Sequence, residues 1–72
     1  MKNKEAFEKL MEIGLGDIRT SKKGVPHLVF NNKSVCWFGK SQVYRVFSPY
    51  PASVQEKKDF KTVGRVVKYL QQ

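Results

Sequence analysis

The residues best suited to chemistry in this 72-residue sequence are basic, and five of them recur near its C-terminal end. At 100° per residue on a helix, they fall within a sector of about 100°; they are Lys57, Lys58, Lys61, Arg65 and Lys68. An apolar sector of about 120° lies opposite; it holds Phe60, Val63, Val66, Val67 and Leu70. Like charges four residues apart repel, so the pattern predicts a ligand that supplies the counter-charge, with an ordinary solvated face as the alternative.

A second basic group surrounds a short turn. It comprises Arg19, Lys22, Lys23, Gly24 and His27, while Lys33 and Lys40 fall on two later turns. Basic side chains on turns can reach phosphate oxygens, and a glycine allows close approach of the backbone. The predicted nucleic-acid-binding set is therefore Lys22, Lys23, His27, Lys40, Lys57, Lys58, Lys61, Arg65 and Lys68.

His27 is the sole histidine of the sequence. A lone histidine builds neither a catalytic triad nor an ordinary metal site. Three roles stay open for His27: a structural or surface residue, an RNA contact, or a single general base for RNA cleavage. No catalytic residue is assigned unless the protein is a ribonuclease, and no cofactor or metal is expected.

The net charge of +8 is unevenly distributed. Residues 1–14 balance three lysines with three glutamates, whereas the remainder has eleven basic residues against Asp17, Glu56 and Asp59. This excess predicts a polyanionic partner, which is a nucleic acid or an acidic protein surface. With one cysteine, a polar start and no long apolar run, the sequence predicts a cytoplasmic protein without a signal peptide or membrane contact.

The elements that must position these residues form one α+β domain spanning residues 1–72. A helix is expected over about 4–13, capped by Asn3 and ended by Gly14. Strands are expected over 17–20, 27–30, 34–38 and 42–47, giving an antiparallel sheet of three or four strands. The Pro-rich segment 48–51 must be irregular. The last helix is expected from Ser53, with Glu56 completing a capping box, or from a later start near Asp59 or Thr62, and ends near Leu70.

The strands are apolar on both faces, so their register stays open. Trp37 shares a face with Val35, and Cys36 shares the other with Phe38. Strand aromatics pack in the core, or they stack unpaired bases on a sheet face without helices. Such a face also suits a protein partner or a homodimer. Cys36 is expected to be an inert core residue.

Two segments resemble a known family. Gly24-Val25-Pro26-His27 resembles the Gly-Pro-x-His turn of double-stranded-RNA-binding domains, and residues 57–61 resemble the lysine cluster that opens their second helix. The αβββα order is also similar, as it is to HicA-type toxins. The resemblance implies that His27 enters a minor groove while Lys57, Lys58 and Lys61 contact phosphates. In a HicA-like ribonuclease, His27 would be catalytic.

The first function hypothesis is therefore a small, non-enzymatic nucleic-acid-binding protein, with RNA favoured over DNA. The second is a small regulator of the phage or mobile-element type that binds and modulates a host protein. A HicA-like ribonuclease is the third.

Overall fold

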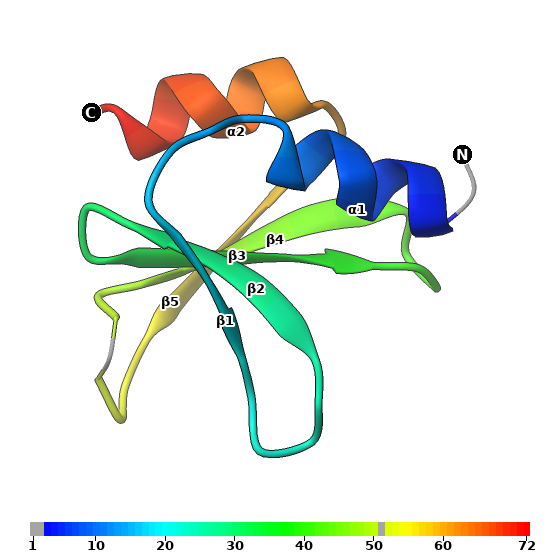
Figure 1. Cartoon of the computed structure of the whole chain (residues 1–72). Helices are drawn as coiled ribbons and strands as arrows, with labels where there is room; N and C mark the ends of the chain where they lie inside the picture. Colours follow the sequence, from blue (N-terminus) through cyan, green and yellow to red (C-terminus); the bar gives the residue numbers. More distant parts are fainter. Residues whose placement is uncertain (1–2, 51) are drawn as a thin grey trace.

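The computed structural model describes residues 3–50 and 52–72. Its elements follow the order α1 (Asn3–Met11), β1 (Asp17–Thr20), β2 (Pro26–Phe30), β3 (Lys33–Phe38), β4 (Val43–Ser48), β5 (Glu56–Phe60) and α2 (Val63–Leu70). All five strands form one antiparallel sheet in chain order, and both helices lie against the same face of it (Figure 1). The predicted α+β class is confirmed, with five strands where three or four were expected.

The four predicted strands all form, with ends within one residue of the expected ones. The turn between β2 and β3 consists of Asn31 and Asn32, with φ angles of 53° and 62°. A two-residue turn with positive φ at both positions matches the right-handed twist of a hairpin, and asparagine tolerates this conformation. The Asn31 side-chain nitrogen donates to the carbonyl oxygens of Leu70 and Gln72, at 3.2 and 3.0 Å. The turn thereby holds the C-terminal end of α2 against the sheet.

The predicted helix start at Ser53 is wrong, because residues 56–60 form β5. This strand pairs with β4 along its whole length, from Ser48↔Glu56 to Tyr44↔Phe60. Without β5, the outer edge of β4 would present a row of unpaired backbone groups. The helix begins only after Thr62, whose hydroxyl accepts a hydrogen bond from the Arg65 amide at 3.4 Å. The later start near Thr62 is thus the correct alternative, and the capping box with Glu56 does not form.

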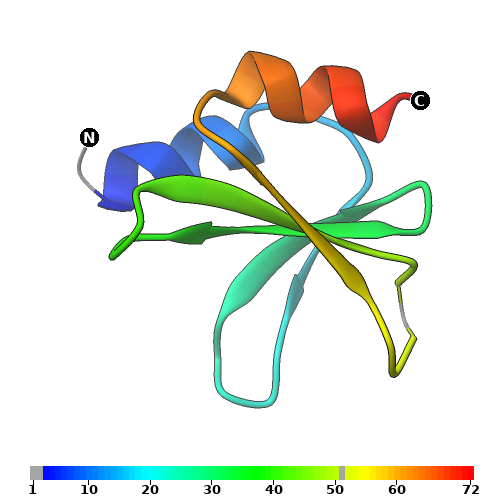
Figure 2. The ribbon, with the colours of Figure 1, turned by 180° about the vertical axis from the view of Figure 1, so that it is seen from behind.

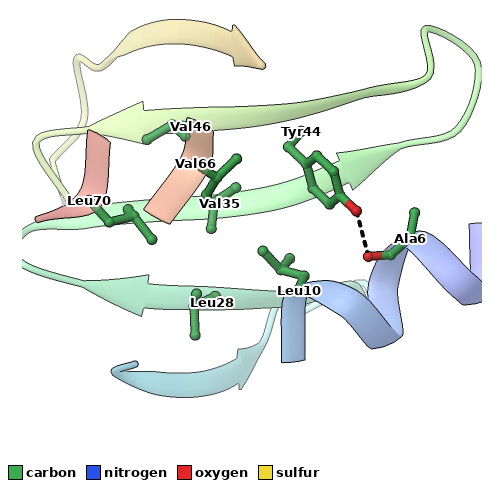
Figure 3. Packing of buried hydrophobic residues seen from close by; sticks show 8 residues of the cluster. All are labelled: Ala6, Leu10, Leu28, Val35, Tyr44, Val46, Val66 and Leu70. Atoms are coloured by element: carbon green, nitrogen blue, oxygen red, sulfur yellow. Dashed lines mark hydrogen bonds between the residues drawn. The ribbon is translucent and has the colours of Figure 1, made fainter. Parts of the chain in front are cut away.

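The core lies between the helices and one sheet face (Figure 3). Its fully buried side chains come from all layers and are Ala6, Leu10, Leu28, Val35, Tyr44, Val46, Val66 and Leu70. The Tyr44 hydroxyl donates to the Ala6 carbonyl oxygen at 2.8 Å, which satisfies the one polar group of this buried side chain. The hydrogen bond also ties α1 to the beginning of β4.

The pairing register assigns each strand residue to a face, because directly opposed residues in antiparallel strands point the same way. Val35 opposes Val46 and Trp37 opposes Tyr44, so Trp37 faces the helices. Its ring nitrogen donates to the Asn3 side-chain oxygen at 2.9 Å. Asn3, expected to cap α1, is itself helical and uses its side chain to contact Trp37 instead.

The opposite side of the sheet, which neither helix covers, is called the open face here (Figures 1 and 2). Its side chains alternate with those of the core along each strand and include Arg19, His27, Cys36, Phe38, Arg45 and Phe47. The β1–β2 hairpin and the beginning of β5 extend away from the helices at the far end of the molecule (Figure 2).

Candidate functional site

Four of the predicted cations surround two adjoining hollows on the helix side of β5. One hollow, of about 420 Å³, is lined by Lys58, Arg65 and Lys68 beside Phe60 and Tyr69. The second, of about 580 Å³, shares Lys58, Phe60 and Arg65, adds Lys61, and is also lined by the acid Asp59. Lys58, Lys61, Arg65 and Lys68 together are called the β5–α2 cluster.

Two elements position the β5–α2 cluster. Lys58 opposes the core residue Val46 in the sheet, so its side chain points toward the helix side. Arg65 and Lys68 are one turn apart on the exposed face of α2, whose opposite face buries Val66 and Leu70. Lys61 lies in the connection between strand and helix. The cluster therefore forms although the predicted long helix does not.

Aromatic rings lie within the same surface. The Phe60 and Tyr69 ring centroids are 5.2 Å apart. The Lys58 ammonium lies 5.0 Å from the Tyr69 centroid, and the Lys33 ammonium lies 5.5 Å from it. Cations at this distance interact with the ring face, so the two lysines are held beside Tyr69.

The acid nearest to the β5–α2 cluster in the chain, Asp59, lines the second hollow but is paired with an arginine of the open face. Asp59 opposes Arg45 in the sheet and belongs to the open face. The Arg45 Nε and Nη2 atoms donate to the two Asp59 carboxylate oxygens at 2.7 and 3.1 Å. This charge-assisted hydrogen bonding holds the pKa of Asp59 below its ordinary value. Asp59 therefore stays ionised, and its charge is offset mainly by Arg45 although it also lines the second hollow.

The remaining predicted lysines lie elsewhere. Lys57 opposes Phe47 and faces the open side, so it is separated from Lys58 by the sheet itself. Its predicted place at the beginning of a helix is wrong. Lys22 and Lys23 are exposed in the β1–β2 turn, away from the helices (Figure 1), and Lys40 is exposed in the β3–β4 turn. The nine predicted residues thus do not form one continuous site.

His27 lies on β2 and points to the open face, opposite Arg19 of β1. It is partly buried against Tyr50, with ring centroids 5.9 Å apart and an edge-on angle of 62°. Within the described chain, no group of three or more His, Cys, Asp or Glu side chains is arranged to hold a metal ion.

Sequence reasoning missed Lys33, Phe60 and Tyr69 as members of the cationic surface. Phe60 was assigned to the apolar sector of a helix, and Tyr69 carried no signal beside the buried Leu70. Lys33 and Tyr69 are 36 positions apart, so no local pattern could bring them together. Their contact depends on the Asn31 hydrogen bonds that hold α2 to the β2–β3 turn.

A wider hollow of about 730 Å³ lies between the β2–β3 turn, the end of β4 and the beginning of β5. Its lining includes one cation, Lys33, and one acid, Glu56, so the two charges offset each other. This balance makes the hollow a poorer anion site than the β5–α2 cluster.

No family of known proteins matches this chain, and no curated protein or solved structure is significantly similar to it. Among the residues that the structure describes, no helix has the length and apolar character needed to cross a membrane.

Proposed function

We propose that this protein is a non-enzymatic nucleic-acid-binding protein and that the β5–α2 cluster contacts phosphates. The observation that carries the proposal is the meeting of Lys58, Lys61, Arg65 and Lys68 around two hollows whose one acid, Asp59, is already paired with Arg45. Four cations around a single acid that is already paired still repel one another, and a phosphate backbone relieves that repulsion.

The beginning of α2 supports an anionic ligand. Its first turn contains no acid and does contain Arg65, although the positive end of the helix dipole favours the opposite arrangement. A phosphate beside this turn would interact favourably with both the dipole and the arginine. Lys61, immediately before the capping residue Thr62, adds a further cation at the same end.

The rings of Phe60 and Tyr69 support a nucleic acid over an acidic protein surface. Both side chains are partly exposed next to the cations. Nucleic acids offer phosphates together with sugars and bases that pack on aromatic rings, and their charge density is about one phosphate per 1.7 Å of duplex. A protein surface rarely concentrates carboxylates to that degree.

An electrophoretic titration tests the proposal with four polyanions: single-stranded RNA, duplex RNA, duplex DNA and polyglutamate of equal charge. We expect retarded complexes with nucleic acid that weaken as salt rises, intact RNA after incubation, and much weaker binding of polyglutamate. The RNA and DNA samples test the expectation that RNA is preferred. Equal binding of polyglutamate would favour an acidic protein partner, and RNA fragments that vanish with His27→Ala would favour a ribonuclease; either result would contradict the proposal.

A further inference from the structure

A small pocket of about 270 Å³ lies on the open face, away from the β5–α2 cluster. Its lining includes His27 from β2, Cys36 from β3, Phe47 from β4 and Tyr50 just beyond β4. Drug-sized ligands occupy pockets of roughly 300–1,000 Å³. The volume therefore suits one flat ring system.

Aromatic side chains provide stacking surfaces in and around this pocket. Tyr50 is in edge-on contact with His27, and Phe47 lies 6.2 Å from the neighbouring Phe38, centroid to centroid. The Cys36 thiol adds no charge at neutral pH, because burial raises its pKa to about 11. The pocket thus combines aromatic rings with the polar side chains of Ser21, Ser34 and Gln55, and Cys36 brings no charge to it.

His27 contributes an unused hydrogen-bonding atom. Its Nδ1 atom lies 3.4 Å from the Val25 carbonyl oxygen, which can only accept, so Nδ1 carries the proton in this contact. In the neutral imidazole, Nε2 then presents a lone pair. Within the described residues Nε2 is buried and has no hydrogen-bond partner. A buried acceptor without a partner is unfavourable, and a ligand with an N–H group in the plane of a ring would satisfy it once the side chains that cover Nε2 move aside.

Cations flank the pocket on both sides. Arg19 opposes His27 on β1, and Lys22 and Lys23 lie in the turn whose neighbours Ser21 and Val25 line the pocket. On the other side, Lys57 opposes Phe47 on β5.

Two acids belong to the same face. Asp59 is bound by Arg45, and Asp17 lies opposite Val29 near the beginning of β1. Positive charge therefore predominates around an aromatic centre, which is the arrangement that single-stranded nucleic acids favour.

We infer that this pocket receives one unpaired base of a single-stranded nucleic acid, with its ring against Phe47 and Tyr50 and an N–H group donating to His27 Nε2. Phosphates farther along the strand in each direction contact Arg19 and Lys57, which lie on the two opposite edges of the sheet. The inference rests on the proposed function and specifies its ligand as unpaired rather than duplex. It also gives His27 a binding role.

A comparison of three oligonucleotides with the full chain tests the inference without any variant. The probes are single-stranded DNA, an abasic DNA of the same length and charge, and the matching duplex, with single-stranded RNA as a fourth sample to separate the two sugar types. Stacking of a base contributes enough for about a 5- to 150-fold difference in affinity. We expect the abasic strand to bind weaker than the natural strand by a factor in this range.

Two variants then locate the base. His27→Phe keeps a ring but removes the acceptor, and Tyr50→Leu keeps apolar volume but removes the ring. Each should weaken binding of single strands several-fold and leave binding of the abasic strand unchanged, while Phe7→Leu on α1, outside both surfaces, serves as the control for loss of a ring; melting curves verify folding. Equal binding of natural strand, abasic strand and duplex would overturn the pocket but leave the proposed function standing. Absence of binding to every nucleic acid would overturn both.

Discussion

Arg45 and Asp59 oppose each other on β4 and β5 and form a two-pronged ion pair on the open face, with Nε–Oδ1 and Nη2–Oδ2 distances of 2.7 and 3.1 Å. The Arg45 guanidinium also lies 4.5 Å from the Phe38 ring centroid. This pair occupies the acid that the sequence places among Lys57, Lys58 and Lys61. Its side chains are partly exposed, so its main effect is on the charge available to a ligand rather than on stability.

The change Asp59→Asn should therefore tighten nucleic-acid binding. The substitution removes a negative charge and frees Arg45 for a phosphate, so the slope of log affinity against log salt should steepen by up to about 0.7 on single strands. The control is Glu8→Gln on the exposed side of α1, which changes the net charge equally. Identical affinities for the two variants would mean that the ion pair does not restrain Arg45.

Substitution of a buried residue of α2 should change stability, and substitution of an exposed cation of α2 should change binding. Val66 is fully buried, whereas Lys68 on the same helix is exposed. Val66→Ala removes two buried carbon groups and leaves a cavity, so it should lower the free energy of unfolding by about 1–3 kcal/mol. Lys68→Ala should leave it nearly unchanged and weaken nucleic-acid binding. Urea unfolding and binding titrations measure both quantities, and a large stability loss from Lys68→Ala would refute this division.

Stability at high pH should depend on Tyr44. Burial raises the pKa of its phenol above the ordinary value of about 10. The folded state therefore favours the protonated phenol, so this contribution to stability is complete below pH 10 and is lost as the pH rises through the folded-state pKa. Tyr44→Phe lacks the hydrogen bond to Ala6, which costs about 0.5–1.5 kcal/mol at pH 8. The difference between wild type and variant should shrink from pH 8 to pH 11 in urea unfolding; a constant difference would contradict the role of ionisation.

The rate at which the Cys36 thiol is alkylated measures access to the pocket of the open face. Because burial raises the pKa of its thiol to about 11, alkylation by iodoacetamide should be slow at pH 7.5 and accelerate toward pH 11. Unfolding in urea should restore the rate of an ordinary thiol, whose pKa is about 8.5. Saturating single-stranded oligonucleotide should slow alkylation further, and mass spectrometry follows the modified fraction. An undiminished rate in the saturated complex would place the base elsewhere.

Local sequence patterns predicted the first helix, four strands and the Asn31–Asn32 turn, because each depends on neighbouring residues and on turn chemistry. The pattern failed over residues 56–60, where Glu, Lys, Lys, Asp and Phe show no alternation of apolar residues. That segment becomes a strand because it completes the edge of β4. Such pairing is a tertiary effect that overrides local preference.

The candidate site was predicted only in part, because strand pairing and not local sequence decides which side chains share a face. Lys58, Lys61, Arg65 and Lys68 do come together, although on a strand, a connection and a short helix instead of one long helix. Lys57 was misplaced because alternate residues of a strand face opposite sides. The register also decided which aromatics remain outside the core: Trp37 faces α1, while Phe38 and Phe47 face away from both helices.

The most direct test of the account compares two double variants that remove the same charge. Lys61→Gln with Lys68→Gln changes the β5–α2 cluster, and Lys4→Gln with Lys9→Gln changes exposed positions of α1. The measurement is the slope of log affinity against log salt for single-stranded RNA. Loss of two phosphate contacts should make the slope shallower by about 1.4 for the cluster variant, with little change for the α1 variant. Equal slopes for the two variants would show that only net charge matters and would contradict a phosphate-binding site at the β5–α2 cluster.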